Sequence, residues 1–331
     1  MAKIVLHIGT HKTASTTIQD MFTANAALLA HYGLIYPQLS RGISGHHGLV
    51  TDWNPLPERY HLPMGSLANL GKIAASYGTG GQTVFLSSEE FSRGDPGARV
   101  DFKALRAALA PFERIEVVCL LREQWHFMQS VYLEVSKTRN PGPVEPYLRQ
   151  ALETRMIEGL WIDYTLLYDH LLGAFAPDEI FFYNYDLWRL SEGGILGGMM
   201  GHLGLNLPLQ DLVQVNGGHS NRSPASLPQW AANMVAHPFP APDWLLEACA
   251  HAFDVEYGSG RESVIWHRAE MAALQDLAQD CNSRLCQRLA GVQSDFTMQN
   301  SAFTPQTVFR DDITLDFWRR VARWSYRAKA G

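Results

Sequence analysis

The sequence predicts an α/β fold: a three-layer sandwich with a central parallel sheet, followed by a mainly helical C-terminal portion. Short apolar runs rich in β-branched residues recur over the first part of the chain, and stretches with apolar residues at helical spacing separate them. Strands that alternate with helices form a parallel sheet that helices cover on both faces. We expect a single domain over residues 1–331, with its core in 1–205 and the helical portion in 206–331.

The predicted strands are short, continuous apolar runs, as expected for strands that are buried on both faces. They lie at Lys3–Gly9, Leu34–Pro37, Gln82–Ser88, Arg114–Leu121 and Glu179–Tyr185. No further buried strand is expected after Leu205. Open parallel sheets bind ligands at the carboxyl ends of their strands, so the residues that follow these runs are the first candidates for a site.

The predicted helices follow the spacing of apolar residues, and Gly33 and the Gly80–Gly81 pair end two of them. In the core they lie at Ala14–His31, Ser66–Tyr77, Asp101–Ala110 and Glu123–Ser136. In the C-terminal portion they lie at Pro224–His237, Pro242–Phe253, Arg268–Leu289 and Ile313–Lys329. Residues Gly42–Pro63 have no period and are expected to form a long loop, which is often a functional feature.

The composition excludes several classes of protein. The formal net charge is −6, so no broad basic field exists to hold nucleic acid or an anionic membrane. The sequence contains no stretch of about eighteen uncharged apolar residues, so no integral membrane segment is predicted. The four Cys include no CxxC pair, which indicates reduced thiols and a cytoplasmic location. An anionic ligand would therefore be held locally, by a few cations and backbone N–H groups.

The segment Gly9–Thr17, GTHKTASTT, lies between the first predicted strand and the first predicted helix. It carries one Lys and five Ser or Thr residues. The first N–H groups of a helix lack hydrogen-bond partners and lie at the positive end of its dipole. A phosphate accepts hydrogen bonds from these groups and carries the charge that the dipole favours. Lys12 adds a point charge. The segment predicts a phosphate cradle, although it lacks the spacing of a Walker A loop.

The order Lys12-Thr13-Ala14-Ser15-Thr16-Thr17 resembles the 5′-phosphosulfate loop of the sulfotransferases that use 3′-phosphoadenosine 5′-phosphosulfate (PAPS), whose core is Lys-Ser/Thr-Gly-Thr-Thr/Ser. The wider stretch HIGTHKTASTTIQ is similar to the bacterial and Golgi-type branch. The resemblance implies the P-loop NTPase-like sulfotransferase fold, PAPS as co-substrate and no metal. It implies donor contacts from His11 and from the six residues named above. Ala14 departs from the family's Gly; its methyl group would be tolerated at negative φ and would otherwise crowd the sulfate end.

A second anchor for the donor is predicted after the strand Arg114–Leu121. Arg122 can bind a phosphate with its guanidinium fork, and Ser130, eight residues on, can donate a hydroxyl. The resemblance implies that the two hold the 3′-phosphate of the donor. The alternative is an ion pair of Arg122 at the sheet edge, with no role for Ser130. The same resemblance makes Arg222 a further candidate contact with the donor. The alternative is that Arg222 belongs to an ordinary solvated loop.

Transfer to a hydroxyl needs a base for its proton and a cation at the leaving oxygen. Lys12 suits the second role. For the first, the segment LSSEEF at Leu86–Phe91 is similar to one that recurs in bacterial members of the family, which makes Glu89 the first candidate and Glu90 the second. The alternative is a helix N-cap at Ser88 with acids in the first turn. The rival bases are four histidines: His7, His11, His46 and His47.

The sequence thus predicts a sulfotransferase that moves a sulfuryl group from PAPS to a hydroxyl of an unidentified acceptor. A neutral sugar, a lipid-linked sugar or a small metabolite is expected, because the chain lacks a strongly basic cleft. One alternative is a nucleotide-dependent small-molecule kinase, against which the missing Walker A spacing counts. The other is a non-catalytic protein of the same fold that binds PAPS or its product 3′,5′-bisphosphoadenosine (PAP), an alternative that Ala14 keeps open.

Overall fold

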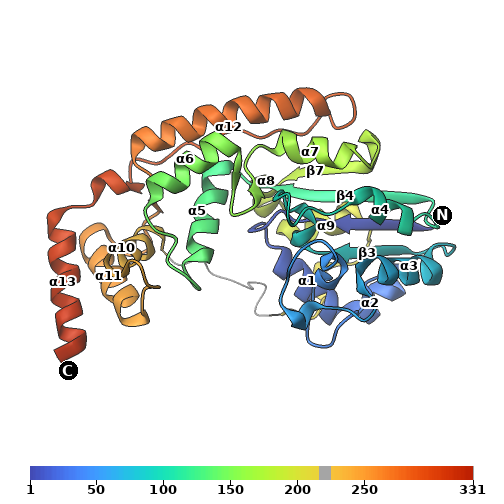
Figure 1. Ribbon diagram of the computed structural model, residues 1–331, viewed down its shortest axis with the longest axis horizontal. Coiled ribbons are helices and arrows are strands. Elements are labelled where there is room, and N and C mark those ends of the chain that lie inside the picture. The colour runs from blue at the N-terminus through green and yellow to red at the C-terminus, as the bar shows by residue number, and fades with distance from the viewer. Residues whose placement is uncertain (216–224, 331) are drawn as a thin grey trace. The chain divides into compact units, whose positions relative to one another are not determined.

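The computed structural model describes residues 1–215 and 225–330. It contains a five-stranded sheet in the order β2-β3-β1-β4-β7, and every pair of neighbouring strands is parallel (Figure 1). The strands are β1 (Lys3–His7), β2 (Leu34–Ile35), β3 (Thr83–Ser87), β4 (Arg114–Leu121) and β7 (Ile180–Asn184). The predicted α/β class, the parallel sheet and all five of its strands are therefore confirmed.

Strand β1 lies in the middle of the sheet, between β3 and β4. Ile4, Val5 and Leu6 are wholly buried, which explains the continuous apolar run in the sequence. His7 is opposite Ser87 on one side and Val118 on the other, so β1 and β3 end at the same level. The segments that follow these two strands consequently leave the sheet side by side.

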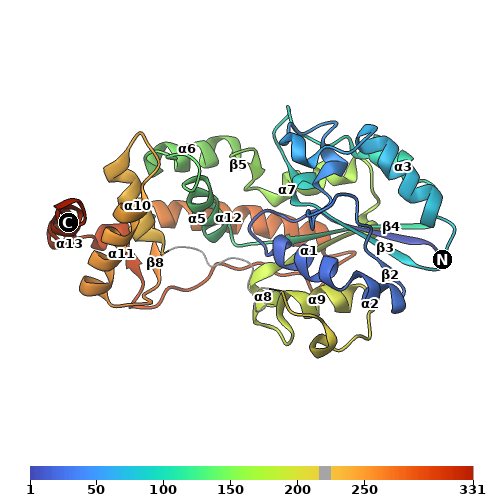
Figure 2. The same ribbon diagram turned by 90° about the horizontal axis from the view of Figure 1, so that it is seen from below.

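Helices cover both faces of this sheet. Apolar residues of α1, α2 and α9 pack on one face, around Val5 and Phe85. Figure 2 shows α3 and α7 on the opposite face. The elements are α1 (Ser15–Ala24), α2 (Ala26–His31), α3 (Gly65–Tyr77), α4 (Phe102–Ala108), β6 (Leu160–Trp161), α7 (Tyr164–Leu172), α8 (Tyr185–Leu190) and α9 (Gly194–His202). The three-layer arrangement is the one predicted from the alternation of strands and helices.

The predicted helix Ala14–His31 is divided at Asn25. The Asn25 side chain donates a hydrogen bond to the carbonyl of Met21 over 2.8 Å and accepts one from the N–H of Val213 over 2.8 Å. The second of these bonds joins residues 188 positions apart, so no local pattern predicts it.

The predicted loop Gly42–Pro63 contains only two short 3₁₀ turns, at His47–Val50 and Glu58–Tyr60.

The chain forms two compact units that alternate along the sequence. The first, which contains the five-stranded sheet, consists of Met1–Arg122, Gly159–Ser220 and Cys281–Met298. The second consists of Glu123–Glu158, Asn221–Asp280 and Gln299–Gly331. Two expectations stay predictions: that the chain is a single domain, and that its core gives way to the helical portion near residue 205.

The second unit is mainly helical. Its elements are α5 (Gln124–Val135), α6 (Val144–Thr154), β5 (Met156–Ile157), α10 (Ser226–Ala236), α11 (Asp243–Tyr257), β8 (Ser263–Val264), β9 (Val308–Phe309) and α13 (Leu315–Ala330); α12 (Arg268–Leu289) passes from this unit into the first. The expectation of no buried strand after Leu205 is wrong, because β8 and β9 form a short buried parallel pair. Each of these strands has only two residues, which are too few to show a period in the sequence.

Within the described ranges, no helix has both the length and the apolar character needed to cross a bilayer.

Candidate functional site

The loop that joins β1 to α1 has the backbone geometry of an anion cradle. Lys12 and Ala14 are left-handed, with φ of 61° and 63°, whereas Thr13 between them is not among the residues with positive φ. This alternation turns successive N–H groups toward one side and creates a concavity that binds anions. Helix α1 begins directly afterwards, at Ser15, and adds the unpaired N–H groups of its first turn.

Hydroxyl groups inside the loop hold its shape. The carbonyl oxygen of Thr10 accepts hydrogen bonds from Thr13 Oγ1 over 2.6 Å and from Ser15 Oγ over 3.4 Å. The N–H of Thr10 donates to the carbonyl of Leu120 over 2.9 Å, which ties the loop to β4. Because both side chains are buried, any contact that Thr13 and Ser15 make with an anion would come from their backbone N–H groups. Thr16 is exposed and Thr17 is half-buried, both in the first turn of the helix.

Ala14 has a positive φ, whereas its methyl group would be free of backbone strain only at negative φ. An Ala in the left-handed region costs about 1 kcal/mol relative to a Gly. The residue packs against the apolar cluster beneath α1, which includes Ile18 and Phe22. Its methyl group is thus accommodated by the core, at the cost of backbone strain.

Gly9 brings the loop into contact with Glu89. The φ of Gly9 is 92°, and a Cβ atom there would lie 2.8 Å from the Cβ of Glu89 and 3.0 Å from its Cα. Only a glycine fits between the two segments. The close approach places the start of the cradle beside the acidic pair that follows β3.

Arg122 lies at the same loop. Its Nη1 donates a hydrogen bond to the carbonyl oxygen of Lys12 over 3.2 Å, and its guanidinium lies 5.2 Å from the centroid of the Tyr185 ring. The hydroxyl of Tyr164 donates to the carbonyl of Arg122 over 2.6 Å. Tyr164 and Tyr185 are the first residues of α7 and α8, and no pattern in the sequence marks them as neighbours of Arg122.

The structure leaves the other two predicted donor contacts, Ser130 and Arg222, untested. Ser130 is buried on α5 in the second unit, so its pairing with Arg122 stays a prediction. Arg222 lies outside the described residues.

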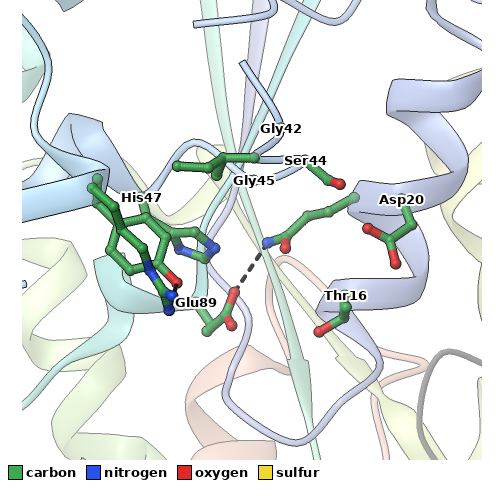
Figure 3. Close-up of a pocket in the computed structure, with 11 residues that line it drawn as sticks. Thr16, Asp20, Gly42, Ser44, Gly45, His47 and Glu89 are labelled. Atoms are coloured by element: carbon green, nitrogen blue, oxygen red, sulfur yellow. Dashed lines mark hydrogen bonds between the residues drawn. The ribbon is translucent and has the colours of Figure 1, made fainter. Parts of the chain in front are cut away.

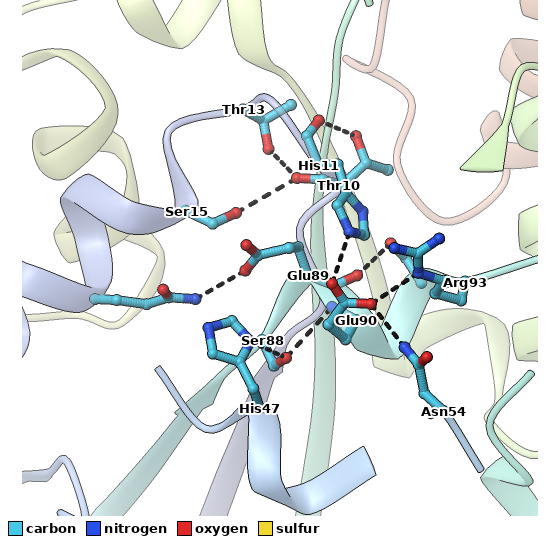
Figure 4. A network of polar contacts seen from close by, with 12 residues as sticks. Thr10, His11, Thr13, Ser15, His47, Asn54, Ser88, Glu89, Glu90 and Arg93 are labelled. Carbon is cyan, nitrogen blue, oxygen red and sulfur yellow. Dashed lines mark hydrogen bonds and ion pairs between the residues drawn. The ribbon is translucent and has the colours of Figure 1, made fainter. Parts of the chain in front are cut away.

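Glu90 is the centre of a network of polar contacts (Figure 4). Its Oε1 accepts from His11 Nε2 over 3.2 Å, and its Oε2 accepts from Asn54 Nδ2 over 2.7 Å and from Arg93 Nε over 2.8 Å. Burial alone raises the pKa of Glu90, but the hydrogen bonds and charges of His11 and Arg93 outweigh burial and hold this pKa well below its ordinary value. A carboxylate with such a low pKa and three donors suits an anchor for His11 better than a base.

Glu89 has a different environment, although it is the next residue. Its Oε2 accepts a hydrogen bond from the Gln19 amide over 3.0 Å, and the residue lines a cavity of about 360 Å³ (Figure 3). The N-cap predicted at Ser88 is also present: Ser88 Oγ accepts from the N–H of Glu90 over 3.3 Å at the start of a 3₁₀ turn, Glu89–Ser92. The predicted cap is therefore confirmed, and the functional interpretation of Glu89 stays a prediction.

The cavity has three walls, all from the first unit. Helix α1 contributes Thr16, Gln19 and Asp20, the segment before α3 contributes Gly42–Gly45 together with His47, Arg59 and Tyr60, and Glu89 completes the lining. The predicted long loop is thus one side of the cavity. The volume lies at the lower end of the range for small-molecule sites, and the lining is rich in hydroxyl, amide and charged groups.

The four histidines divide into two pairs. His7 and His46 are almost fully buried, and burial lowers the pKa of each to about 4, so both are neutral at neutral pH. His46 bonds the carbonyl of Pro37 over 2.7 Å through Nε2 and accepts from the N–H of Ser87 over 2.9 Å through Nδ1, which is a structural role. His11 bonds Glu90, and His47 lines the cavity with its Nδ1 2.9 Å from Ser88 Oγ. His47 is therefore the rival base that shares a cavity with Glu89.

Comparison with known proteins adds the following. No protein-family model and no curated protein match the chain. Among solved structures it is similar to a sulfotransferase from Alicyclobacillus acidocaldarius (16% identity, 65% of this chain and 87% of that chain, TM-score 0.39). It is also similar to the sulfotransferase domain from the curacin biosynthetic pathway (15%, 86% and 98%, 0.41) and to a mouse sulfotransferase complexed with PAP (10%, 63% and 61%, 0.37). At these identities and TM-scores the similarity does not establish membership of a family.

Proposed function

We propose that the chain is a sulfotransferase that moves a sulfuryl group from PAPS to a hydroxyl of an acceptor. The observation that carries this proposal is the contact between Gly9 and Glu89, which joins an anion cradle to a carboxylate at a cavity. Such a neighbourhood suits a reaction between a bound anion and a hydroxyl compound. The residue order of the loop, which resembles the 5′-phosphosulfate loop, selects phosphosulfate among the possible anions.

In the proposed reaction the N–H groups of the loop and Lys12 bind the phosphosulfate. The acceptor hydroxyl attacks the sulfur in line with the bridging oxygen, and its proton passes to Glu89. A bond forms between the acceptor oxygen and sulfur, while the bond from sulfur to the bridging phosphate oxygen breaks with its electron pair on that oxygen. Lys12 and the helix N-terminus stabilise the charge that grows there. The products are PAP and the sulfated acceptor.

We propose Arg122 as the second anchor for the donor. Its guanidinium lies at the Lys12 carbonyl, at the carboxyl end of the strand next to β1. In the proposal Arg122 binds the 3′-phosphate of the donor with help from Ser130, and Arg222 is a further donor contact. This arrangement would give the site its preference for PAPS over nucleotides that lack a 3′-phosphate.

The cavity beside Glu89 is the proposed acceptor site. Two carboxylates, of Asp20 and Glu89, and one guanidinium, of Arg59, are among its lining groups. A cavity with this balance suits an uncharged hydroxylated acceptor, such as a sugar, a lipid-linked sugar or a small metabolite, better than a highly sulfated one. A panel of neutral acceptors should accordingly be sulfated before heparin-like ones, and the reverse order would exclude this assignment.

A ligand-binding experiment tests the donor assignment directly. A ligand that binds only the native state raises the melting temperature. PAP should raise it more than AMP, and more than ATP with Mg²⁺, in parallel titrations of the purified protein. A larger shift with ATP and Mg²⁺ would favour the kinase alternative. Binding of PAP together with the failure of every acceptor in the panel would favour a non-catalytic binding protein.

A further inference from the structure

Gln19 is a buried polar residue in the candidate site that no motif of the sequence singles out. It lies on α1, one helical turn after Ser15, and is 3% exposed. Its amide nitrogen is 3.0 Å from Glu89 Oε2, 3.2 Å from Ser87 Oγ and 3.5 Å from the Ser87 carbonyl oxygen. The dashed line at Glu89 in Figure 3 marks the first of these contacts.

The chemistry of its partners determines how the amide is oriented. A carboxylate and a backbone carbonyl only accept hydrogen bonds, so the NH₂ group of Gln19 must face Glu89 and Ser87. Its two N–H groups then serve two acceptors. Ser87 Oγ also lies 2.8 Å from His7 Nδ1, and the buried His7 is neutral. Gln19, Ser87 and His7 are therefore all uncharged at neutral pH.

This feature separates Glu89 from Glu90. The carboxylate of Glu90 is held by the guanidinium of Arg93 and by His11, and these contacts lower its pKa strongly. The hydrogen bond that Gln19 donates to Glu89 comes from a neutral amide, which orients the carboxylate without adding a positive charge beside it. None of the described residues forms an ion pair with Glu89, and an oriented carboxylate of this kind suits a general base.

The surroundings hold the Gln19 amide in place. A Cβ atom on Gly45 would lie 2.8 Å from Gln19 Cδ and Oε1, and 2.6 Å from His47 Nε2. The backbone of the Gly42–Gly45 segment thus packs directly on the amide. Gln19 is also on the helix whose N-terminus forms part of the anion cradle, about 6 Å along the axis from Ser15. One rigid helix consequently relates the cradle to the Glu89 carboxylate.

We propose that Gln19 is a positioning residue for Glu89: by holding Oε2, it leaves Oε1 to accept the proton of the acceptor hydroxyl. This inference rests on the proposed sulfuryl transfer. It predicts that the Gln19 side chain contributes to turnover, and that it contributes only through Glu89.

The experiment compares Gln19→Met, which keeps the length of the side chain and removes the donor, with the matched control Gln38→Met at an exposed glutamine. Gln19→Met should lower kcat by about 10- to 100-fold, because an unoriented base is used less efficiently. The KM for the acceptor and the Kd for PAP should change less than about threefold. Gln38→Met should leave kcat, KM and Kd unchanged.

A double-mutant cycle distinguishes positioning from packing. In a Glu89→Gln background, Gln19→Met should lower the residual kcat by less than about twofold, because the group it orients is already absent. Equal kcat for Gln19→Met and the native protein would overturn the inference, and so would a full additional loss in the Glu89→Gln background. Loss of PAP binding in Gln19→Met would show a structural role in the cradle instead. Failure of the native protein itself to bind PAP or transfer sulfate would overturn the proposed function, and that outcome is visible without any variant.

Discussion

The Nη1 of Arg122 donates a hydrogen bond to the carbonyl oxygen of Lys12 over 3.2 Å, so the end of β4 is tied to the loop that follows β1. The bond joins residues 110 positions apart. It lies where two parallel strands end side by side, which is the expected ligand-binding edge of an open sheet.

Arg122→Ala should weaken PAP binding by at least about tenfold, because a charged hydrogen-bonding group to a phosphate is lost. Arg122→Lys should give an intermediate affinity, since an ammonium replaces the charge but not the fork. Calorimetric titration with PAP and with AMP checks the assignment. The loss should be several-fold smaller for AMP, which lacks the 3′-phosphate; an equal loss for both ligands would place Arg122 elsewhere on the nucleotide.

Glu89→Gln and Glu90→Gln should have different effects on turnover and stability. Glu89→Gln should lower kcat by about 100-fold or more and leave the Kd for PAP nearly unchanged, as expected for the loss of a base. Glu90→Gln should mainly destabilise the fold, by about 1–3 kcal/mol, because Arg93 and His11 lose the charge of the carboxylate that they share and one of its two acceptor oxygens becomes a donor. Steady-state kinetics and urea unfolding of both variants check this. Unchanged turnover in Glu89→Gln would move the base to His47, which lines the same cavity.

The low pKa of Glu90 predicts how the stability of the protein depends on pH. A carboxylate whose pKa is depressed in the folded state stabilises that state above its unfolded pKa of about 4.5, and this contribution is lost as the pH falls below that value. The stability difference between the native protein and Glu90→Gln should therefore shrink by about 1 kcal/mol between pH 7 and pH 3.5. Urea unfolding at the two pH values measures it, and a constant difference would show that Glu90 is not held as a carboxylate by its neighbours.

Ala14→Gly should relieve the strain of a left-handed alanine. The expected gain in the free energy of unfolding is up to about 1 kcal/mol, reduced by the extra conformational freedom of glycine in the unfolded chain. Because the methyl group packs toward the core, PAP affinity should stay within about threefold. Thermal unfolding and calorimetry check the two effects. A large gain in PAP affinity would instead mean that the methyl group obstructs the anion.

The sequence by itself determined the features that depend on neighbouring residues. The apolar runs predicted the strands, since a strand buried on both faces needs an unbroken run of apolar side chains. The run from Gly9 to Thr17 predicted the loop, because its hydroxyls, its lysine and the start of the helix are contiguous. The capping role of Ser88 was open to prediction for the same reason.

The tertiary structure decided which of these side chains meet. Two adjacent acids have equivalent places in the sequence, but Glu90 is surrounded by Arg93, His11 and Asn54, whereas Glu89 meets Gln19 and the cavity. The sign of φ at Ala14 was likewise undetermined, because an alanine adopts the left-handed region only where the surrounding packing compensates for the strain. These contacts differ in sequence separation, from 3 positions between Glu90 and Arg93 to 70 between Gln19 and Glu89. The long-range contacts exist only once the strands have paired in register and brought their carboxyl ends together.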